Sequence, residues 1–156
     1  AHYTAMLREG NIPLRPGIKQ LMADARSHGI RLAIATTTTP ENVSALLEVG
    51  LGKNWESYFA ANGCGDIVPH KKPAPDIYFL VLDKLKLAPE DCIALEDSEN
   101  GLRSSLAAGI KTFVTVNHYT RNQNFDGAAG IFDDLSDLSG FYRAAKLPLP
   151  KQQVSV

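Results

Sequence analysis

Two apolar segments that show no polar alternation constrain the fold of this chain more than any other feature. IRLAIATTT spans residues 30–38 and DCIALE spans residues 91–96, and both consist largely of apolar or β-branched residues. Strands with this composition are buried on both faces, which is typical of a parallel sheet covered by helices on each side.

Helical patterns separate these two segments and follow them. Helices are predicted over residues 16–29, from residue 40 onward, over 76–87 and over 99–109. Further strands are predicted at residues 57–62, 111–116 and 129–134. The alternation of strands and helices predicts an α/β fold: a three-layer, Rossmann-like core around a parallel sheet.

The composition limits the partners of this chain. Its 156 residues fit one domain, and a net charge of −1 provides no general attraction to nucleic acid or to anionic membranes. No apolar run approaches the roughly 20 residues of a membrane-spanning helix. Cys64 and Cys92 are too few for a disulfide framework. We therefore predict reduced cysteines, a cytoplasmic location, no nucleic-acid or membrane partner, and a monomer as the favoured state.

Three polar clusters fall where predicted strands end or loops approach them. They are Thr36 to Thr39 after the first buried strand, Lys71 and Lys72 before Pro73, and Glu96 and Asp97 after the second buried strand. In parallel α/β sheets, ligands bind beyond the carboxyl ends of the strands. The three clusters therefore indicate a candidate site at that edge.

Each cluster also has a structural interpretation. The threonines could bind a phosphate with hydroxyl and backbone N–H groups, or they could simply end a strand and cap a helix. Because Pro73 restricts the residue before it, Lys72 could direct a fixed positive charge at a phosphoryl oxygen, or it could be a solvated loop lysine.

The adjacent acids leave two interpretations open. Glu96 and Asp97 supply the hard oxygen ligands that Mg²⁺ prefers, but acids also favour the N-terminus of the helix that follows. A zinc site is not favoured, because His2, His28, His70 and His118 show no ligand spacing.

Read in order, three segments closely resemble the second, third and fourth motifs of the haloacid dehalogenase-like phosphohydrolases. The segments are LAIATTTT, KKPAPDIY and IALEDSENGLRSSLAAG, and the resemblance covers roughly residues 12–135. Within that superfamily the chain looks most like the β-phosphoglucomutase and CbbY-like branch. The resemblance implies an α/β haloacid dehalogenase-like core with Mg²⁺ as cofactor.

The resemblance also implies a role for each candidate residue. Thr36, together with the backbone N–H of Thr37, would bind the transferring phosphoryl group. Lys72 would stabilise negative charge on the nucleophile and on the phosphoryl oxygens. Asp97 would be a direct Mg²⁺ ligand, and Glu96 would support the metal through water or pair with Lys72.

The chain departs from the family pattern at its start. The first motif, D-x-D-G-T/S, which supplies the nucleophilic aspartate, does not occur in the sequence. We therefore expect a C-terminal portion that lacks most of the first strand and the cap domain. We divide it into the end of a cap helix with a linker (residues 1–15), the core (16–146) and a peripheral tail (147–156). We predict that this chain alone is inactive.

The implied function is a Mg²⁺-dependent phosphohydrolase. It would act on a small phosphorylated sugar, with xylulose-1,5-bisphosphate as a candidate, through an aspartyl-phosphate intermediate on an aspartate outside this chain. The alternatives are a phosphosugar mutase of the β-phosphoglucomutase type and a non-catalytic domain that binds a ligand or a partner.

Overall fold

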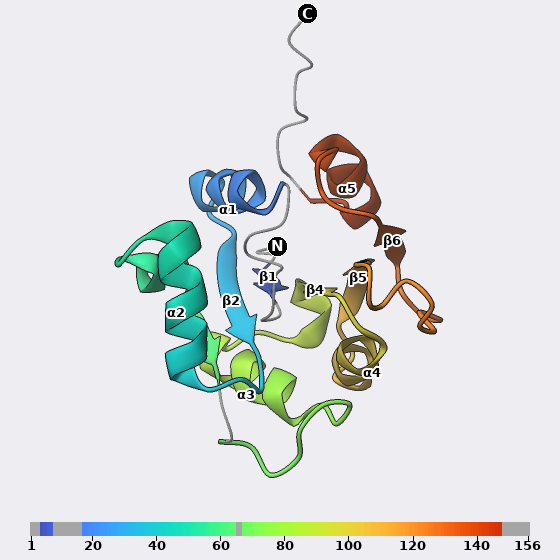
Figure 1. The fold of residues 1–156 in the computed structure, drawn as a ribbon, viewed down its shortest axis with the longest axis horizontal. Helices are drawn as coiled ribbons and strands as arrows, with labels where there is room; N and C mark the ends of the chain where they lie inside the picture. The colour runs from blue at the N-terminus through green and yellow to red at the C-terminus, as the bar shows by residue number, and fades with distance from the viewer. Residues whose placement is uncertain (1–3, 8–16, 65–66, 148–156) are drawn as a thin grey trace, which may run out of the picture.

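A computed structural model describes residues 4–7, 17–64 and 67–147 of this chain. Its centre is a six-stranded, fully parallel sheet with the strand order β3-β2-β1-β4-β5-β6 (Figure 1). The strands are β1 (Thr4–Leu7), β2 (Arg31–Ala35), β3 (Ala61–Gly63), β4 (Cys92–Glu96), β5 (Lys111–Thr115) and β6 (Gly130–Phe132). The helices are α1 (Ile18–Ser27), α2 (Pro40–Leu51), α3 (Asp76–Leu85), α4 (Glu99–Ala107) and α5 (Leu138–Ala145), with short 3₁₀ helices at Trp55–Tyr58 and Pro89–Asp91. The predicted fold class is confirmed.

Helices cover both faces of the sheet, so the core has three layers. Figure 1 shows α1 and α5 above the sheet and α3 and α4 below it. The strands place their larger side chains on the α1 and α5 side: Leu32, Ile93, Leu95 and Phe113. They place smaller ones on the α3 side: Ala33, Ala35, Cys92 and Ala94. Since side chains alternate along a strand, this division by size lets α3 pack closely against the sheet.

The predicted apolar stripe of the first helix is confirmed. The buried residues of α1 are Ile18, Leu21, Met22 and Ala25.

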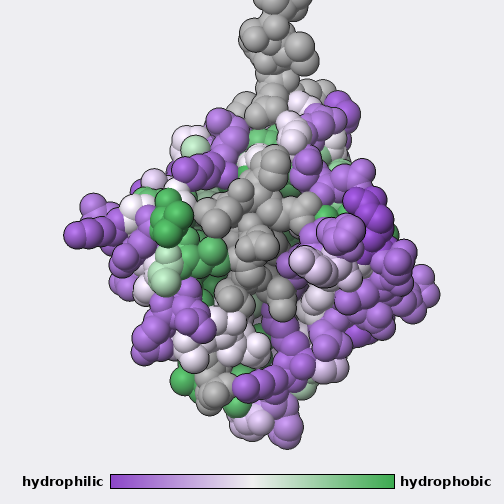
Figure 2. Space-filling view, viewed as in Figure 1, coloured by the Kyte–Doolittle hydropathy of each residue, from purple (hydrophilic) through white to green (hydrophobic). Residues whose placement is uncertain are grey.

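The face of the molecule seen in Figure 2 is mostly hydrophilic, with a small group of apolar residues on the α2 side. Among the described residues, no helix is long and apolar enough to cross a membrane.

The start of the chain differs from our prediction. We assigned residues 1–15 to a cap helix and a linker, but Thr4–Leu7 forms strand β1 in the middle of the sheet. Ala5 lies opposite Leu32 of β2 and opposite Ile93 of β4. Backbone hydrogen bonds to β2 on one side and to β4 on the other stabilise β1 as a strand. Without β1, both neighbouring strands would leave unpaired N–H and C=O groups. The remaining residues of that predicted segment, 1–3 and 8–15, lie outside the described residues.

Two further segments differ from their predictions. The segment predicted as a strand over 57–62 begins as 3₁₀ helix, and β3 starts only at Ala61. Helix α5 was not predicted, although Asp137 caps it by accepting a hydrogen bond from Gly140 N and its apolar side is buried. Leu147 is buried in the apolar cluster that α1 and α5 form against the sheet, and it lies one residue beyond the predicted end of the core at residue 146. The rest of the predicted tail lies outside the described residues.

Cys92 provides a prediction about stability at high pH. Burial raises the pKa of its thiol from the ordinary 9.0 to about 11, the nearby Asp91 carboxylate adds to this effect, and Arg31 opposes it. Above pH 9.0 the unfolded chain loses this proton while the folded chain keeps it, so the free energy of unfolding should fall as pH rises toward about 11. Denaturant unfolding of wild-type protein and Cys92→Ala measures this effect: the wild type should lose more stability across that window. Parallel pH dependence in the two proteins would contradict the assignment.

Candidate active site

Lys72 joins the carboxyl ends of two strands that are not neighbours in the sheet. Its Nζ donates to the backbone oxygen of Ala35 on β2 at 3.1 Å and to Glu96 Oε2 on β4 at 2.7 Å. Because β1 lies between β2 and β4, these contacts place the ammonium at the edge where the central strand ends. The Lys72 side chain is only 6% exposed. This excludes the interpretation of a solvated loop lysine.

The loop that carries Lys72 is tied to the rest of the core. It contains a cis peptide bond between Lys72 and Pro73. Ser104 Oγ on α4 donates to the backbone oxygen of Ala74 at 2.7 Å. The loop is therefore anchored on one side by α4 and on the other by the contacts of the lysine itself.

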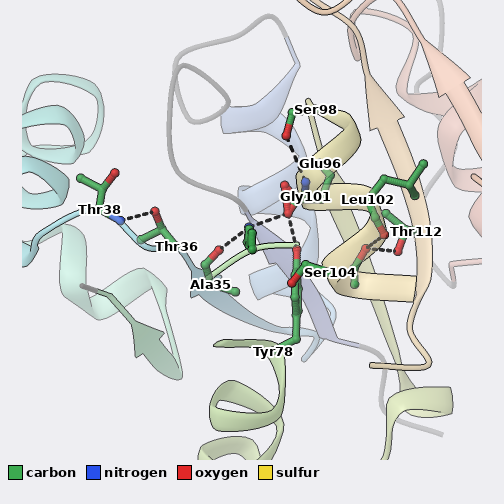
Figure 3. A network of polar contacts seen from close by, with 12 residues as sticks. Ala35, Thr36, Thr38, Tyr78, Glu96, Ser98, Gly101, Leu102, Ser104 and Thr112 are labelled. Carbon is green, nitrogen blue, oxygen red and sulfur yellow. Dashed lines mark hydrogen bonds and ion pairs between the residues drawn. The ribbon is translucent and has the colours of Figure 1, made fainter. Parts of the chain in front are cut away.

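Glu96 is a fully buried carboxylate with two donors on one oxygen. Besides the Lys72 ammonium, Oε2 accepts a hydrogen bond from the hydroxyl of Tyr78 on α3 at 2.6 Å, and Figure 3 shows Tyr78 directed at Glu96. Helix α4 approaches the other oxygen closely: a Cβ added at Gly101 would lie 2.1 Å from Glu96 Oε1. A buried charge is tolerated when a counter-charge and hydrogen bonds compensate for its lost hydration, and this environment supplies both.

The threonines form a tight turn at the end of β2. Thr36 is buried, its N–H donates to Gly63 of β3 at 2.8 Å, and its Oγ1 accepts from Thr38 N at 3.1 Å. Thr39 is the N-cap of α2, with Oγ1 accepting from Asn42 N at 3.4 Å. The capping interpretation is therefore confirmed for Thr39. Thr36 and Thr37 lie one and two residues beyond Ala35, whose oxygen contacts Lys72, so they belong to the same edge.

Asp97 lies at this edge as well. It directly follows β4, is 6% exposed, and precedes Ser98, whose Oγ accepts from Gly101 N at 3.1 Å as the N-cap of α4. Among residues 4–7, 17–64 and 67–147 there is no group of three or more His, Cys, Asp or Glu side chains that could hold a metal. Mg²⁺ needs only one or two protein carboxylates and completes its coordination with water and phosphate, so Asp97 fits as one ligand. Glu96 pairs with Lys72, which is one of the two roles that the family resemblance implied for it.

The structure thus brings the predicted site residues together. Thr36, Thr37, Lys72, Glu96 and Asp97 come from three separate segments and meet at one sheet edge.

His70 Nδ1 lies 3.1 Å from Asp76 Oδ2 at the start of α3. No histidine of the described residues belongs to a metal-ligand cluster.

Sequence reasoning missed two residues that shape the site. Tyr78 lies on the buried side of a helical pattern, which indicates core packing and gives no sign of its hydroxyl contact. Gly101 follows Glu99 and Asn100 at the start of a helix. A glycine inside a predicted helix is a signal of close approach by another group, and here it could have been read that way.

Comparisons with known proteins agree with this geometry. The model of the haloacid dehalogenase-like hydrolase family matches residues 2–109, which is more than half of the chain. The chain belongs to the haloacid dehalogenase-like hydrolase family.

Several known proteins are similar to this chain in sequence and structure. The plasmid-encoded protein CbbY of Cupriavidus necator is 48% identical over 136 residues, which are 87% of this chain and 54% of that protein. A crystal structure of a CbbY variant from Rhodobacter sphaeroides in complex with xylulose-1,5-bisphosphate has a TM-score of 0.77 and 46% identity, and covers 80% of this chain and 55% of that one. A crystal structure of a candidate β-phosphoglucomutase from Thermotoga maritima has a TM-score of 0.71 and 27% identity, and covers 87% of this chain and 60% of that one. This haloacid dehalogenase-like chain therefore spans little more than half the length of these relatives.

Proposed function

We propose that the whole protein is a Mg²⁺-dependent phosphohydrolase of small phosphorylated sugars, with xylulose-1,5-bisphosphate as the candidate substrate. The observation that carries the proposal is the buried ammonium of Lys72, held between Ala35 O at 3.1 Å and Glu96 Oε2 at 2.7 Å at the carboxyl edge of the sheet. A fixed cation at this place stabilises charge that develops on a transferring phosphoryl group.

Each residue of the edge contributes one interaction. The Thr36 hydroxyl and the Thr37 N–H would bind the phosphoryl oxygens, and Lys72 would neutralise the charge between the phosphoryl group and the attacking carboxylate. Asp97 would hold Mg²⁺, with Glu96 supporting it through water or through Lys72. When it is bound, Mg²⁺ would stabilise the negative charge on the phosphoryl oxygens. The nucleophile would be an aspartate outside this chain, because no D-x-D motif occurs in the sequence.

The substrate class is supported by the relatives. The structure of CbbY with xylulose-1,5-bisphosphate is 46% identical to this chain, which makes a phosphorylated sugar the first substrate to test. We further propose a cytoplasmic location and a monomer. A phosphosugar mutase is the second candidate, because the candidate β-phosphoglucomutase from Thermotoga maritima shares the fold and 27% identity.

Release of inorganic phosphate from xylulose-1,5-bisphosphate by the whole protein tests the proposal. Turnover should require Mg²⁺, and Asp97→Asn should weaken the apparent Mg²⁺ affinity by roughly 10- to 100-fold because a direct ligand loses its charge. Asp83→Asn is the control, since Asp83 is 78% exposed and removed from the edge, and it should leave the affinity unchanged. The 156-residue chain alone should show no turnover of xylulose-1,5-bisphosphate.

Two outcomes would contradict this proposal. If the protein converts one sugar phosphate into its isomer and releases no phosphate, it is a mutase. If neither reaction occurs with Mg²⁺ present, the phosphohydrolase assignment is wrong.

A further inference from the structure

The hydroxyl of Tyr78 and the ammonium of Lys72 converge on the same carboxylate oxygen. The hydroxyl lies 2.6 Å and the ammonium 2.7 Å from Glu96 Oε2. The ring of Tyr78 also lies against the cation, with the ammonium 5.1 Å from the ring centroid. Three residues from a loop, a helix and a strand therefore form one buried unit.

Packing alone does not explain this hydroxyl. Tyr78 is fully buried among the apolar residues between α3 and the sheet, including Ile77, Val81 and Ala94. A phenylalanine would fill the same volume without requiring a hydrogen-bond partner, whereas a buried hydroxyl costs free energy unless it is paired. The paired hydroxyl is thus a polar feature built into an otherwise apolar layer.

The hydroxyl has a geometric consequence for the lysine. A carboxylate oxygen accepts hydrogen bonds in two preferred directions, and Tyr78 occupies one of them on Glu96 Oε2. The ammonium then approaches along the other direction, where it also reaches the backbone oxygen of Ala35. Without the hydroxyl, the carboxylate loses one of the hydrogen bonds that orient it, and the ammonium that it holds is then fixed less tightly at the sheet edge.

We infer that Tyr78 is a positioning residue, whose hydroxyl fixes Glu96 so that Lys72 keeps its charge directed at the phosphoryl site. This inference rests on the proposed function. A hydrogen bond that only orients a charge has its largest effect where charge develops, which is in the transition state. Removal of the hydroxyl should therefore lower kcat more than it raises KM.

The test is Tyr78→Phe in the whole protein, with Tyr142→Phe as its matched control. Tyr142 is also buried and donates to a carboxylate at the same distance, 2.6 Å to Asp24 Oδ2, but on the α1 and α5 side of the sheet. Tyr78→Phe should lower kcat by about 10-fold with KM changed less than about 2-fold, since a hydrogen bond to a charged group is lost. Tyr142→Phe should leave kcat unchanged.

A double variant separates positioning from general loss of stability. In the Lys72→Met background, Tyr78→Phe should lower the residual kcat no further, because residues that act as a unit are not additive. An additional 10-fold loss in that background, or wild-type kcat in Tyr78→Phe, would overturn the inference.

A binding measurement keeps this inference separate from the proposed function. If the wild-type protein shows no phosphatase turnover, the proposed function fails, but calorimetric titration with orthovanadate, an analogue of the phosphoryl-transfer transition state, and Mg²⁺ still reports on Lys72. Tyr78→Phe should then bind orthovanadate several-fold more weakly than Tyr142→Phe. Equal orthovanadate affinity in the two variants would overturn the inference, whatever the catalytic result.

Discussion

Gly101→Ala is expected to destabilise the whole protein by at least about 3 kcal/mol and to remove the proposed phosphatase activity. The added Cβ would lie 2.1 Å from Glu96 Oε1 and 2.5 Å from the carboxyl carbon of the same residue. The carboxylate cannot simply move aside, because Lys72 and Tyr78 hold its other oxygen. Either α4 shifts away from β4 or the buried ion pair is broken, and both changes alter the sheet edge.

Gly140→Ala is the matched control for this variant. Like Gly101, Gly140 is the third residue after an N-cap and donates its N–H to the side chain of that cap, in this case Asp137. A Cβ there would lie 3.0 Å from Asp137 Oδ2, on an exposed side chain that can adjust. Alanine is a better helix former than glycine, so Gly140→Ala should be neutral or stabilise by up to about 1 kcal/mol. Chemical denaturation measures both variants, and equal effects of the two substitutions would contradict the close-approach argument.

Lys72→Met is expected to lower the free energy of unfolding by about 3–5 kcal/mol, because it leaves the carboxylate of Glu96 buried without its cation. The Glu96 side chain is 0% exposed, so water cannot replace the lost ammonium without a rearrangement.

Arg121→Met is the control for this variant. It removes the cation of an ion pair with Asp133, and the side chains of Arg121 and Asp133 are 63% and 80% exposed. Exposed pairs contribute little, so this change should cost less than about 1 kcal/mol. A cost for Lys72→Met as small as that of Arg121→Met would show that the buried pair is not needed.

The sequence predicted the layers of this fold well because strand burial and helix periodicity are local signals. The strands around Leu32 and Ile93 have no polar alternation, and such strands occur where both faces of a sheet are covered. Strand β1 was not predicted, because four residues carry little periodicity and their strand conformation depends on pairing with β2 and β4. Helix α5 was missed for a different reason: its local signal was overlooked. The segment has an N-cap followed by apolar residues at helical spacing, namely Asp137 and then Leu138, Phe141, Tyr142 and Ala145.

The site could be predicted only in part from the sequence. Strand ends and a proline placed Thr36, Lys72 and Asp97 at one edge, since the carboxyl ends of parallel strands share that edge. The contacts of Tyr78 and Gly101 with Glu96 could not be predicted, because they depend on how closely α3 and α4 approach β4. Helix packing distances of this kind are set by the whole core and not by any short segment.

The turnover of the double variant Lys72→Met/Glu96→Gln is the most direct test of whether this buried unit is catalytic. The variant removes both charges together, so it should recover much of the stability that Lys72→Met loses. If the ammonium stabilises the transferring phosphoryl group, phosphate release should still fall by roughly 10²- to 10³-fold relative to wild type. A stable double variant that hydrolyses the sugar phosphate at the wild-type rate would show that the unit only supports the fold.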